Sequence, residues 1–227
     1  MGSFGMFNGY DTHIEFNRFV NLDSIEWRII DSLLNSTSTH AEDLWKMLKY
    51  PSEDCLFQEP LTRAEKIKMI YRDNGESSDK RVFMAPYTDD AWQEQASRLD
   101  VFVSRAVPKS HVLSTVNVTV EIIVHNKINN IYNNAEVDNP HSNPSEFDEE
   151  GGLLIPSKSR ATAMLRDVLA ELNGKMVAGV GQLQFNTQLS PYSTAQQYVW
   201  NNRAYIGYSA TFSTLMSGVS ETPEVGY

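Results

Sequence analysis

Residues 116–125 read Val-Asn-Val-Thr-Val-Glu-Ile-Ile-Val-His, and this stretch decides the fold class. Its apolar residues alternate with polar ones, so one side of an extended strand is apolar and the other largely polar. The apolar side carries Val116, Val118, Val120, Ile122 and Val124. This pattern is typical of an antiparallel sheet with one face on a core. The stretch therefore predicts the central strand of a half-buried sheet.

Shorter segments with the same alternation lie on both sides of this strand in the sequence. Leu99, Val101 and Val103 alternate with Asp100 and Phe102, and Ile206, Tyr208, Ala210 and Phe212 share one side of a later run. A turn around Pro108 joins the first of these runs to residues 116–125. We expect strands at 99–103, 180–185 and 205–212, and an edge strand at 81–85 that Pro86 ends.

Three helices are predicted before the sheet, at 24–35, 40–49 and 63–71, because their apolar residues recur with helical spacing. A residue suited to an N-cap, with Glu three positions later, precedes or opens each helix. The pairs are Asp23 with Glu26, Thr39 with Glu42, and Thr62 with Glu65. Pro51 and Pro60 mark a break between the second and third helices.

One further helix is expected after Ser157, ending at Asn173-Gly174, where the glycine suits a left-handed cap. Its apolar stripe contains Ala161, Met164, Leu165, Val168, Leu169 and Leu172. This stripe and the valine-rich strand face each need a partner. We therefore expect the helix to pack across that face of the sheet.

The predicted fold class is α+β: N-terminal helices followed by an antiparallel sheet with a helix packed across one face. The predicted organisation is an extended N-terminal arm at 1–22, a helical segment at 23–73, and an α+β core at 74–215. The core contains an acidic loop at 133–156, and a tail follows at 216–227.

Composition narrows the classes of function. The 227-residue chain has a formal net charge of −10, which disfavours non-specific binding to nucleic acid, since such binding needs clustered Lys and Arg. No apolar run is long enough to span a membrane, and the first residues lack signal-peptide features, so a cytosolic site of synthesis is expected. The single cysteine, Cys55, excludes an internal disulfide and is expected to serve packing.

The sequence offers little that would support catalysis. The five histidines are scattered, with no pair at a spacing of four on a helix. Gly179-Val180-Gly181 precedes a strand and lacks a phosphate-loop lysine, so we interpret it as a turn or bulge. A metal-dependent nuclease could use Asp89, Asp90 and Glu94, but adjacent carboxylates point in different directions. We expect no enzyme activity, no cofactor and no metal.

Two groups of residues are candidates for contacts between subunits or rings. Aromatic residues without a regular period crowd the N-terminal arm, where they suit docking on a neighbour or packing back on the same domain. Polar and aromatic residues fill a later loop that suits subunit contacts. The candidates are Phe4, Phe7, Tyr10, Phe16, Phe19, Gln196, Gln197, Tyr198 and Trp200.

A third group is acidic. Between Asn129 and Ser157 the chain has no Lys or Arg but contains Glu136, Asp138, Glu146, Asp148, Glu149 and Glu150. If this loop faces a DNA passage, its charge repels phosphate. If it faces outward, its charge serves only solubility.

Several short motifs, taken in order, resemble the subunits of the tailed-phage neck and tail-terminator (head-tail connector) family. The resemblance covers roughly residues 40–215. In the front half it rests on Leu-Trp-Lys-Met-Leu-Lys-Tyr at 44–50, Pro-Leu-Thr at 60–62 and Arg-Val-Phe at 81–83. In the back half it rests on Glu-Ile-Ile-Val-His-Asn at 121–126, Leu-Asn-Gly at 172–174, Gly-Val-Gly-Gln-Leu at 179–183 and Tyr-Ile-Gly-Tyr at 205–208.

The resemblance implies a structural virion protein, made in the host cytoplasm, that assembles with itself into a closed ring of six- or twelve-fold symmetry. Its implied neighbours are portal or adaptor proteins and tail tube or sheath proteins, and DNA meets it only in passing through the lumen. No membrane is implied, and such families bring no catalytic residues.

The alternative is a small acidic binding or regulatory module that occludes a DNA-binding partner. A monomer or dimer in solution would favour this module, whereas a closed ring would favour the structural subunit.

Overall fold

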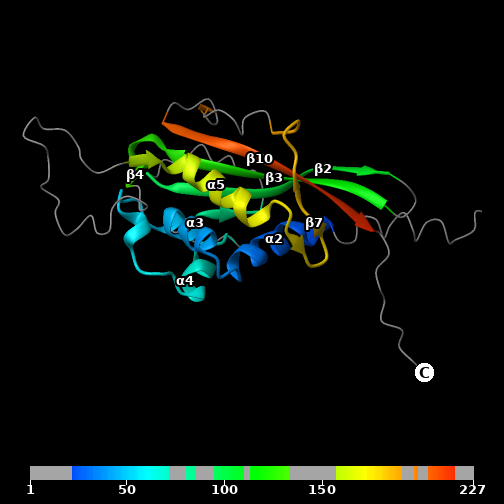
Figure 1. Ribbon diagram of the computed structural model, residues 1–227, viewed down its shortest axis with the longest axis horizontal. Helices are drawn as coiled ribbons and strands as arrows, with labels where there is room; N and C mark the ends of the chain where they lie inside the picture. Colours follow the sequence, from blue (N-terminus) through cyan, green and yellow to red (C-terminus); the bar gives the residue numbers. More distant parts are fainter. Residues whose placement is uncertain are drawn as a thin grey trace, which may run out of the picture.

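The fold is α+β, as predicted, with a mainly antiparallel sheet covered on one face by helices (Figure 1). The computed structural model describes residues 22–71, 80–84, 95–109, 113–132, 157–190, 197–198 and 204–217. No helix in these ranges is long and apolar enough to cross a membrane.

The sheet is built around three long strands, β2 (Ser97–Pro108), β3 (Leu113–His125) and β10 (Tyr205–Ser217). Short strands complete it: β1 (Val82–Phe83), β8 (Gln184–Phe185) and β9 (Gln197–Tyr198). The order is β1-β2-β3-β10-β8, and β9 also pairs with β10. Among the described strand pairs of this sheet, β1 and β2 alone run parallel. The quoted stretch therefore forms the central strand, as predicted.

Strand register brings apolar side chains together on one face. Val120 lies opposite Val101 on β2 and Ala210 on β10, and none of the three is exposed to solvent. All five apolar side chains that define the predicted face of β3 are fully buried. Burying one such side chain contributes about 1.5–3 kcal/mol, so this face is a main source of stability.

Helices α2 (Ile25–Leu34), α3 (Thr39–Lys49), α4 (Arg63–Lys68) and α5 (Arg160–Leu172) form the second layer, together with short turns at η1 (Leu22–Ser24), η2 (Cys55–Phe57) and η3 (Asn126–Ile128). The predicted packing of α5 on the sheet is confirmed, since it contacts β3 and β10, while α2 and α3 lie against β2. One helix could not cover the face, because 13 helical residues span about 20 Å and 13 strand residues about 44 Å.

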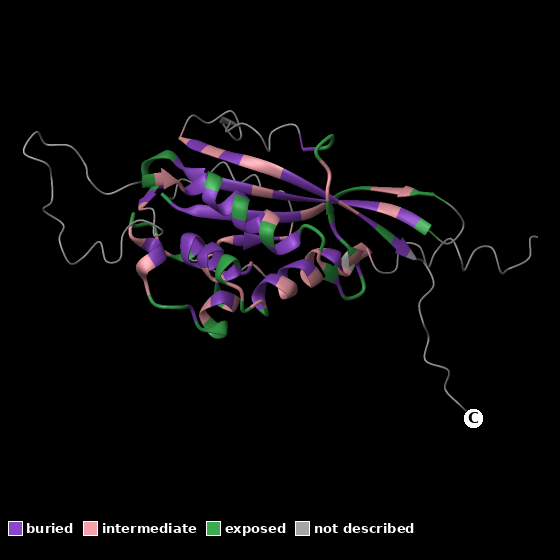
Figure 2. Ribbon diagram, viewed as in Figure 1, coloured by how far each residue is buried: buried purple, intermediate pink, exposed green. Residues whose placement is uncertain are grey.

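The strands consequently run beyond the helical layer at one end. Figures 1 and 2 show the far ends of β2, β3 and β10 projecting past the helices, with exposed and intermediate residues where the cover stops. We call this part, residues 104–109, 113–115 and 213–217, the projecting end.

The predicted helix starts were right for one helix and wrong in detail for two. Thr62 and Glu65 form a complete capping box on α4. Ser38 caps α3 in place of Thr39, so Glu42 is one position too late for a box. It accepts bonds from Leu61 N and Lys66 Nζ instead. Asp23 lies in η1 before α2, whose N-cap Ser24 makes no side-chain cap.

Some strand boundaries also differ from the prediction. The run at 180–185 is split into β7 (Gly181–Gln182) and β8, with β6 (Met176–Val177) pairing β7. The final strand continues five residues beyond Phe212, and β2 starts two residues earlier than Leu99 and ends at Pro108. The pair β4 (Asn130–Tyr132) and β5 (Ser157–Ser159) was not predicted, because neither segment has a hydrophobic alternation to reveal it.

Candidate functional site

The six acidic candidates, Glu136, Asp138, Glu146, Asp148, Glu149 and Glu150, lie outside the described residues. The points where their segment leaves and rejoins the fold are described. Tyr132 of β4 pairs with Ser157 of β5, so residues 133–156 start and end at neighbouring positions. In Figure 1 these anchors lie at the end of the long axis opposite the projecting end.

The candidate contact residues of the arm, Phe4, Phe7, Tyr10, Phe16 and Phe19, also lie outside the described residues, as do Gln196 and Trp200. Gln197 and Tyr198 form β9, whose backbone pairs with Gly207 and Ile206 of β10. The chain after β8 therefore returns to the edge of the sheet at β9. Of the candidate contact residues, Gln197 and Tyr198 alone fall within the described ranges, so the structure shows no cluster of these candidates there.

A surface that the sequence did not reveal lies on the projecting end. In the described part of the chain four large hydrophobic side chains are exposed, and Leu113, Met176 and Leu215 are three of them. Met176 is 71% exposed and Leu215 is 62% exposed, and both line a groove of about 360 Å³. Thr115, Gln182, Gln184 and Ser213 complete most of its wall. We call this surface the end groove.

The turn between β6 and β7 places Met176 beside β10. Gly179 and Gly181 hold φ values of 73° and 104°, which side-chain-bearing residues rarely adopt. The turn is fixed to the body by Thr214 Oγ1, which donates to Val180 O at 3.1 Å, and by Arg28 Nη1, which donates to Ala178 O at 3.1 Å. The predicted interpretation of Gly179-Val180-Gly181 as a turn is confirmed.

The edge of β10 beside the end groove has backbone groups that point away from β3. Ser190 Oγ accepts from Thr211 N and Asn186 N donates to Thr211 O, so the amide and carbonyl of Thr211 face the outer edge. Backbone orientation repeats every two residues, so Ser213 and Leu215 face the same way. Ser213 pairs with Gln184 of β8, and Leu215 lies past that pairing. Beside Leu215 lies β7, since a Cβ added at Gly181 would come within 3.1 Å of the Leu215 carbonyl oxygen.

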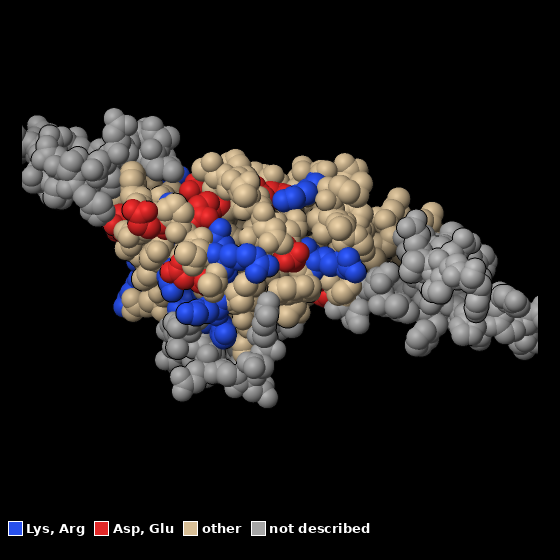
Figure 3. All heavy atoms as spheres, turned by 90° about the horizontal axis from the view of Figure 1, so that it is seen from below, with Lys and Arg blue, Asp and Glu red and all other residues tan. Residues whose placement is uncertain are grey.

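None of the side chains lining the end groove is ionisable. The helical layer is different. Figure 3 views it from below and shows Lys and Arg atoms over the middle of the face, with Asp and Glu atoms gathered toward the end where β4 lies. The end groove is therefore an uncharged, partly apolar surface on an otherwise charged molecule.

A polar cluster joins α3 to α5. His40 Nδ1 lies 2.9 Å from Asp167 Oδ1, and the same oxygen accepts from Arg166 Nε at 2.8 Å. Ser38 donates to Glu171 across the same contact. In a catalytic triad, a histidine held by an aspartate removes the proton from a serine hydroxyl. In the described part of the chain His40 bonds Asp167 alone, and no hydroxyl reaches it. The arrangement therefore links two helices without completing a triad.

Asp43 of α3 lies close to this cluster and is 7% exposed. Burial raises the pKa of its carboxyl, and Asp167 raises it further, while Lys46, Lys158 and Arg166 oppose the shift. Asp43 lines a pocket of about 350 Å³ at the start of α3 together with Ser38, Glu42 and Lys46. Lys46 Nζ donates to Leu56 O, so this lysine is committed to holding the chain after α3.

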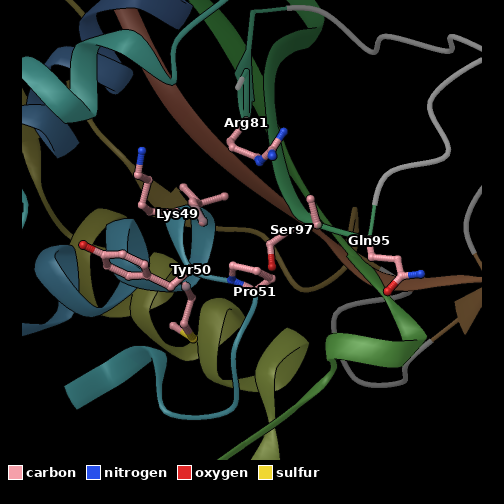
Figure 4. A pocket seen from close by; sticks show the side chains of 9 residues that line it. Lys49, Tyr50, Pro51, Arg81, Gln95 and Ser97 are labelled. Carbon is pink, nitrogen blue, oxygen red and sulfur yellow. The ribbon is translucent and has the colours of Figure 1, made fainter. Parts of the chain in front are cut away.

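A second, much smaller pocket lies between the end of α3 and the start of β2. Figure 4 shows Tyr50, Pro51 and Ser97 around it, with Arg81 on its far side. Its volume is about 40 Å³, enough for a water molecule and too small for a substrate. Within the described ranges the buried Ser97 Oγ has no hydrogen-bond partner, which is the setting in which an ordered water is expected.

On the other face of the sheet, Arg98 donates two hydrogen bonds to Asp100, at 2.6 and 2.7 Å, and stacks over the ring of Phe83. Glu121 lies opposite Asp100, and burial raises the pKa of its carboxyl although Arg98 opposes the shift. Arg98 and Asp100 thus compensate each other's charge within the fold. No group of three or more His, Cys, Asp or Glu side chains in the described ranges could hold a metal ion.

Sequence reasoning missed the end groove because Met176 and Leu215 are isolated apolar residues that lie 39 positions apart. The only available signal was the continuation of the last strand through Thr214, Leu215 and Met216.

A family model described as YomW matches residues 41–214 of the chain. No curated protein and no solved structure matches it.

Proposed function

We propose that this chain, which belongs to the phage-associated YomW family, is a structural virion protein of a tailed phage. In this proposal it is a ring-forming subunit of the neck, the head-tail connector or tail terminator, that joins portal to tail. It has no catalytic role, and its partners are copies of itself and the adjoining rings. DNA meets it only in passage.

The end groove is the observation that carries the proposal. A free surface that brings exposed large apolar side chains together is typical of an association surface, because monomeric soluble proteins rarely leave such a patch uncovered. Leu215 and Met176 supply the apolar part, and Gln182 and Gln184 add polar side chains to the same wall. A head-to-tail contact through such a surface closes into a ring when the rotation permits.

Charge distribution supports the proposed contact with a DNA passage. The described residues hold 16 of the 19 Lys and Arg but only 13 of the 29 Asp and Glu, a surplus of three positive charges. The remaining residues thus carry a surplus of 13 negative charges, and six of their acids fall between β4 and β5. We propose that this acidic segment lines the passage, where its charge would keep phosphate from the wall.

The test is the oligomeric state and the location of the protein. Light scattering after size-exclusion chromatography and negative-stain imaging should show a closed ring, alone or after addition of the adjoining neck proteins. Labelled protein should be found at the neck of purified virions. A chain that stays monomeric or dimeric with those proteins present, and that is absent from virions, would contradict the proposal and favour the acidic regulatory module.

A further inference from the structure

We infer that the pocket at the start of α3 binds an alkylammonium group, with the carboxylate of Asp43 as its anchor. The pocket has a volume of about 350 Å³. The ammonium belongs either to a lysine side chain of a partner protein or to a small free amine, since both present the same group. The site lies in the helical layer, and the inference does not depend on the proposed ring-forming function.

The pocket is built from one face of α3 and from a second chain segment. Thr39, Asp43 and Lys46 line it and recur every three or four residues, so they share a face of the helix. Glu42 lies at the border of this face, and Pro60 comes from the linker before α4. The packing of α3 and the linker therefore fixes the position of the lining side chains.

In the described part of the chain, three charged side chains line the pocket, and two of them are already engaged within the fold. Glu42 forms an ion pair with Lys66 at 2.6 Å. Lys46 Nζ donates to Leu56 O at 3.2 Å. Asp43 is the remaining charged group that can meet a ligand.

The carboxyl of Asp43 lacks the partners that a buried acid normally has. The residue is 7% exposed, and within the described ranges its carboxyl has neither a hydrogen-bond donor nor an ion-pair partner. Burial raises the pKa of this carboxyl, and the nearby cations oppose the shift from a distance. A buried carboxyl without a donor is costly, so a donor from a ligand would stabilise it.

An ammonium group fits this carboxyl better than other donors do. It brings a positive charge as well as hydrogen bonds, whereas a hydroxyl or an amide brings hydrogen bonds alone. An anion would be repelled by Asp43. The exposed Thr37 and Thr39 add hydroxyl oxygens that can accept the other ammonium hydrogens. Pro60 offers apolar surface to an alkyl stem, and the volume lies within the range of ligand pockets.

The experiment titrates n-butylammonium chloride into the full-length protein and measures binding by saturation-transfer NMR, which suits both a monomer and a ring. We expect saturable binding. The uncharged n-butanol has the same stem and should bind at least about tenfold more weakly, because it lacks the charge-assisted hydrogen bond.

Asp43→Asn should weaken the binding of butylammonium at least about tenfold. Its melting temperature should stay the same or rise, because the change removes a buried charge, so the loss of binding cannot come from unfolding. Asp31→Asn on α2 is the matched control. It removes the same charge from a residue that does not line the pocket, and it should bind butylammonium as the wild type does.

A second titration distinguishes the two sources of the ammonium. Nα-acetyl-lysine methylamide carries the same group on a peptide-like unit. Binding at least as tight as that of butylammonium would support a lysine side chain of a partner protein. Weaker binding than that of butylammonium, still lost in Asp43→Asn, would support a small free amine.

Three results would overturn the inference. They are the absence of saturable binding of both amines to the wild type, equal binding of butanol and butylammonium, and undiminished binding in Asp43→Asn. None of them bears on ring formation. A wild type that binds the amines but forms no ring, even with the adjoining neck proteins, would support this site and contradict the proposed function.

Discussion

The guanidinium of Arg160 donates a 2.6 Å hydrogen bond to the carbonyl of Tyr50, although 110 positions separate the two residues. It also donates to the carbonyls of Met47, Pro51 and Ser52, so four carbonyls at and beyond the end of α3 share one fully buried side chain. Helix C-terminal carbonyls lack partners within the helix and carry partial negative charge. Arg160, at the start of α5, supplies both the donors and the charge.

Replacing Arg160 with Met should therefore destabilise the fold strongly. The change removes the donors from one buried carbonyl, that of Met47, and from three part-buried ones, and we expect the free energy of unfolding to fall by about 3–5 kcal/mol. Arg160→Lys should lose less, because one ammonium keeps the charge but not the planar fork. Urea unfolding measures both variants. The exposed Arg105→Met is the control, and equal losses in Arg160→Met and this control would contradict the role assigned to Arg160.

At Gly207 the backbone of β10 leaves no room for a side chain beside β3. A methyl group added at this residue would lie 1.8 Å from the carbonyl oxygen of Ile122, which belongs to the backbone and cannot rotate away. Gly207→Ala should force the two strands apart and cost more than about 4 kcal/mol, or leave the protein insoluble. The neighbouring Ser209→Ala should be tolerated. A melting temperature within about 2 °C of the wild type in Gly207→Ala would refute the predicted clash.

Asp43 should make stability fall as pH rises through its titration. Burial, then Asp167, raises the pKa of this carboxyl in the folded state above its usual value, so the folded chain binds more protons than the unfolded chain between the two pKa values. The neutral form is thus favoured in the fold, and stability falls as pH rises from the unfolded pKa through the folded one.

Asp43→Asn should accordingly stabilise the protein at pH 7 by an amount in the range of about 0.5–2 kcal/mol that single charge optimisations give. The gain should vanish below the unfolded pKa of an aspartate, about 3.9, where both variants are neutral. Chemical unfolding at several pH values measures this difference. A loss of stability at pH 7 would mean that the attraction of Asp43 to Lys46 and Lys158 outweighs its burial.

The acidic segment provides a functional prediction. Changing Glu136, Asp138, Glu146, Asp148, Glu149 and Glu150 to Gln or Asn should leave the free energy of unfolding within about 0.5 kcal/mol and leave rings intact. If the segment lines the passage, phosphate would meet less repulsion, and DNA packaging or ejection should slow, most clearly at about 0.01 M salt, where screening is weakest. Glu59→Gln in the helical layer is the control. Kinetics that match the wild type at every ionic strength would place the segment on the outside.

Local patterns were enough to predict most of the framework. The alternation at 116–125 predicted the central strand because the side chains of a strand alternate between its faces whatever its neighbours are. Thr62 and Glu65 predicted the start of α4 because a capping box closes within four residues. Gly174, with φ of 78°, ends α5 as its sequence indicated.

Where two positions competed for one role, the sequence was not enough. Thr39 and Ser38 can both cap a helix, and Ser38 takes the position in the fold, where its hydroxyl also reaches Glu171 on α5. The sequence places Cys55 next to Asp54, an acid that raises the pKa of its thiol. The main cause is its burial, and Arg160 lowers the pKa in opposition.

The sequence by itself determined the α+β class, the central strand and the apolar stripe of α5, because each depends on periodicities of the backbone. Only the tertiary structure decided the four-carbonyl contact of Arg160, the approach of Gly207 to Ile122 and the end groove. The two exposed residues of the end groove lie 39 positions apart, Gly207 and Ile122 lie 85 apart, and Arg160 lies up to 113 positions from the carbonyls that it binds. No local spacing in the sequence encodes such contacts. Strand register decides which residues of distant segments face each other, and the larger rise per residue of a strand leaves part of the sheet beyond the helices.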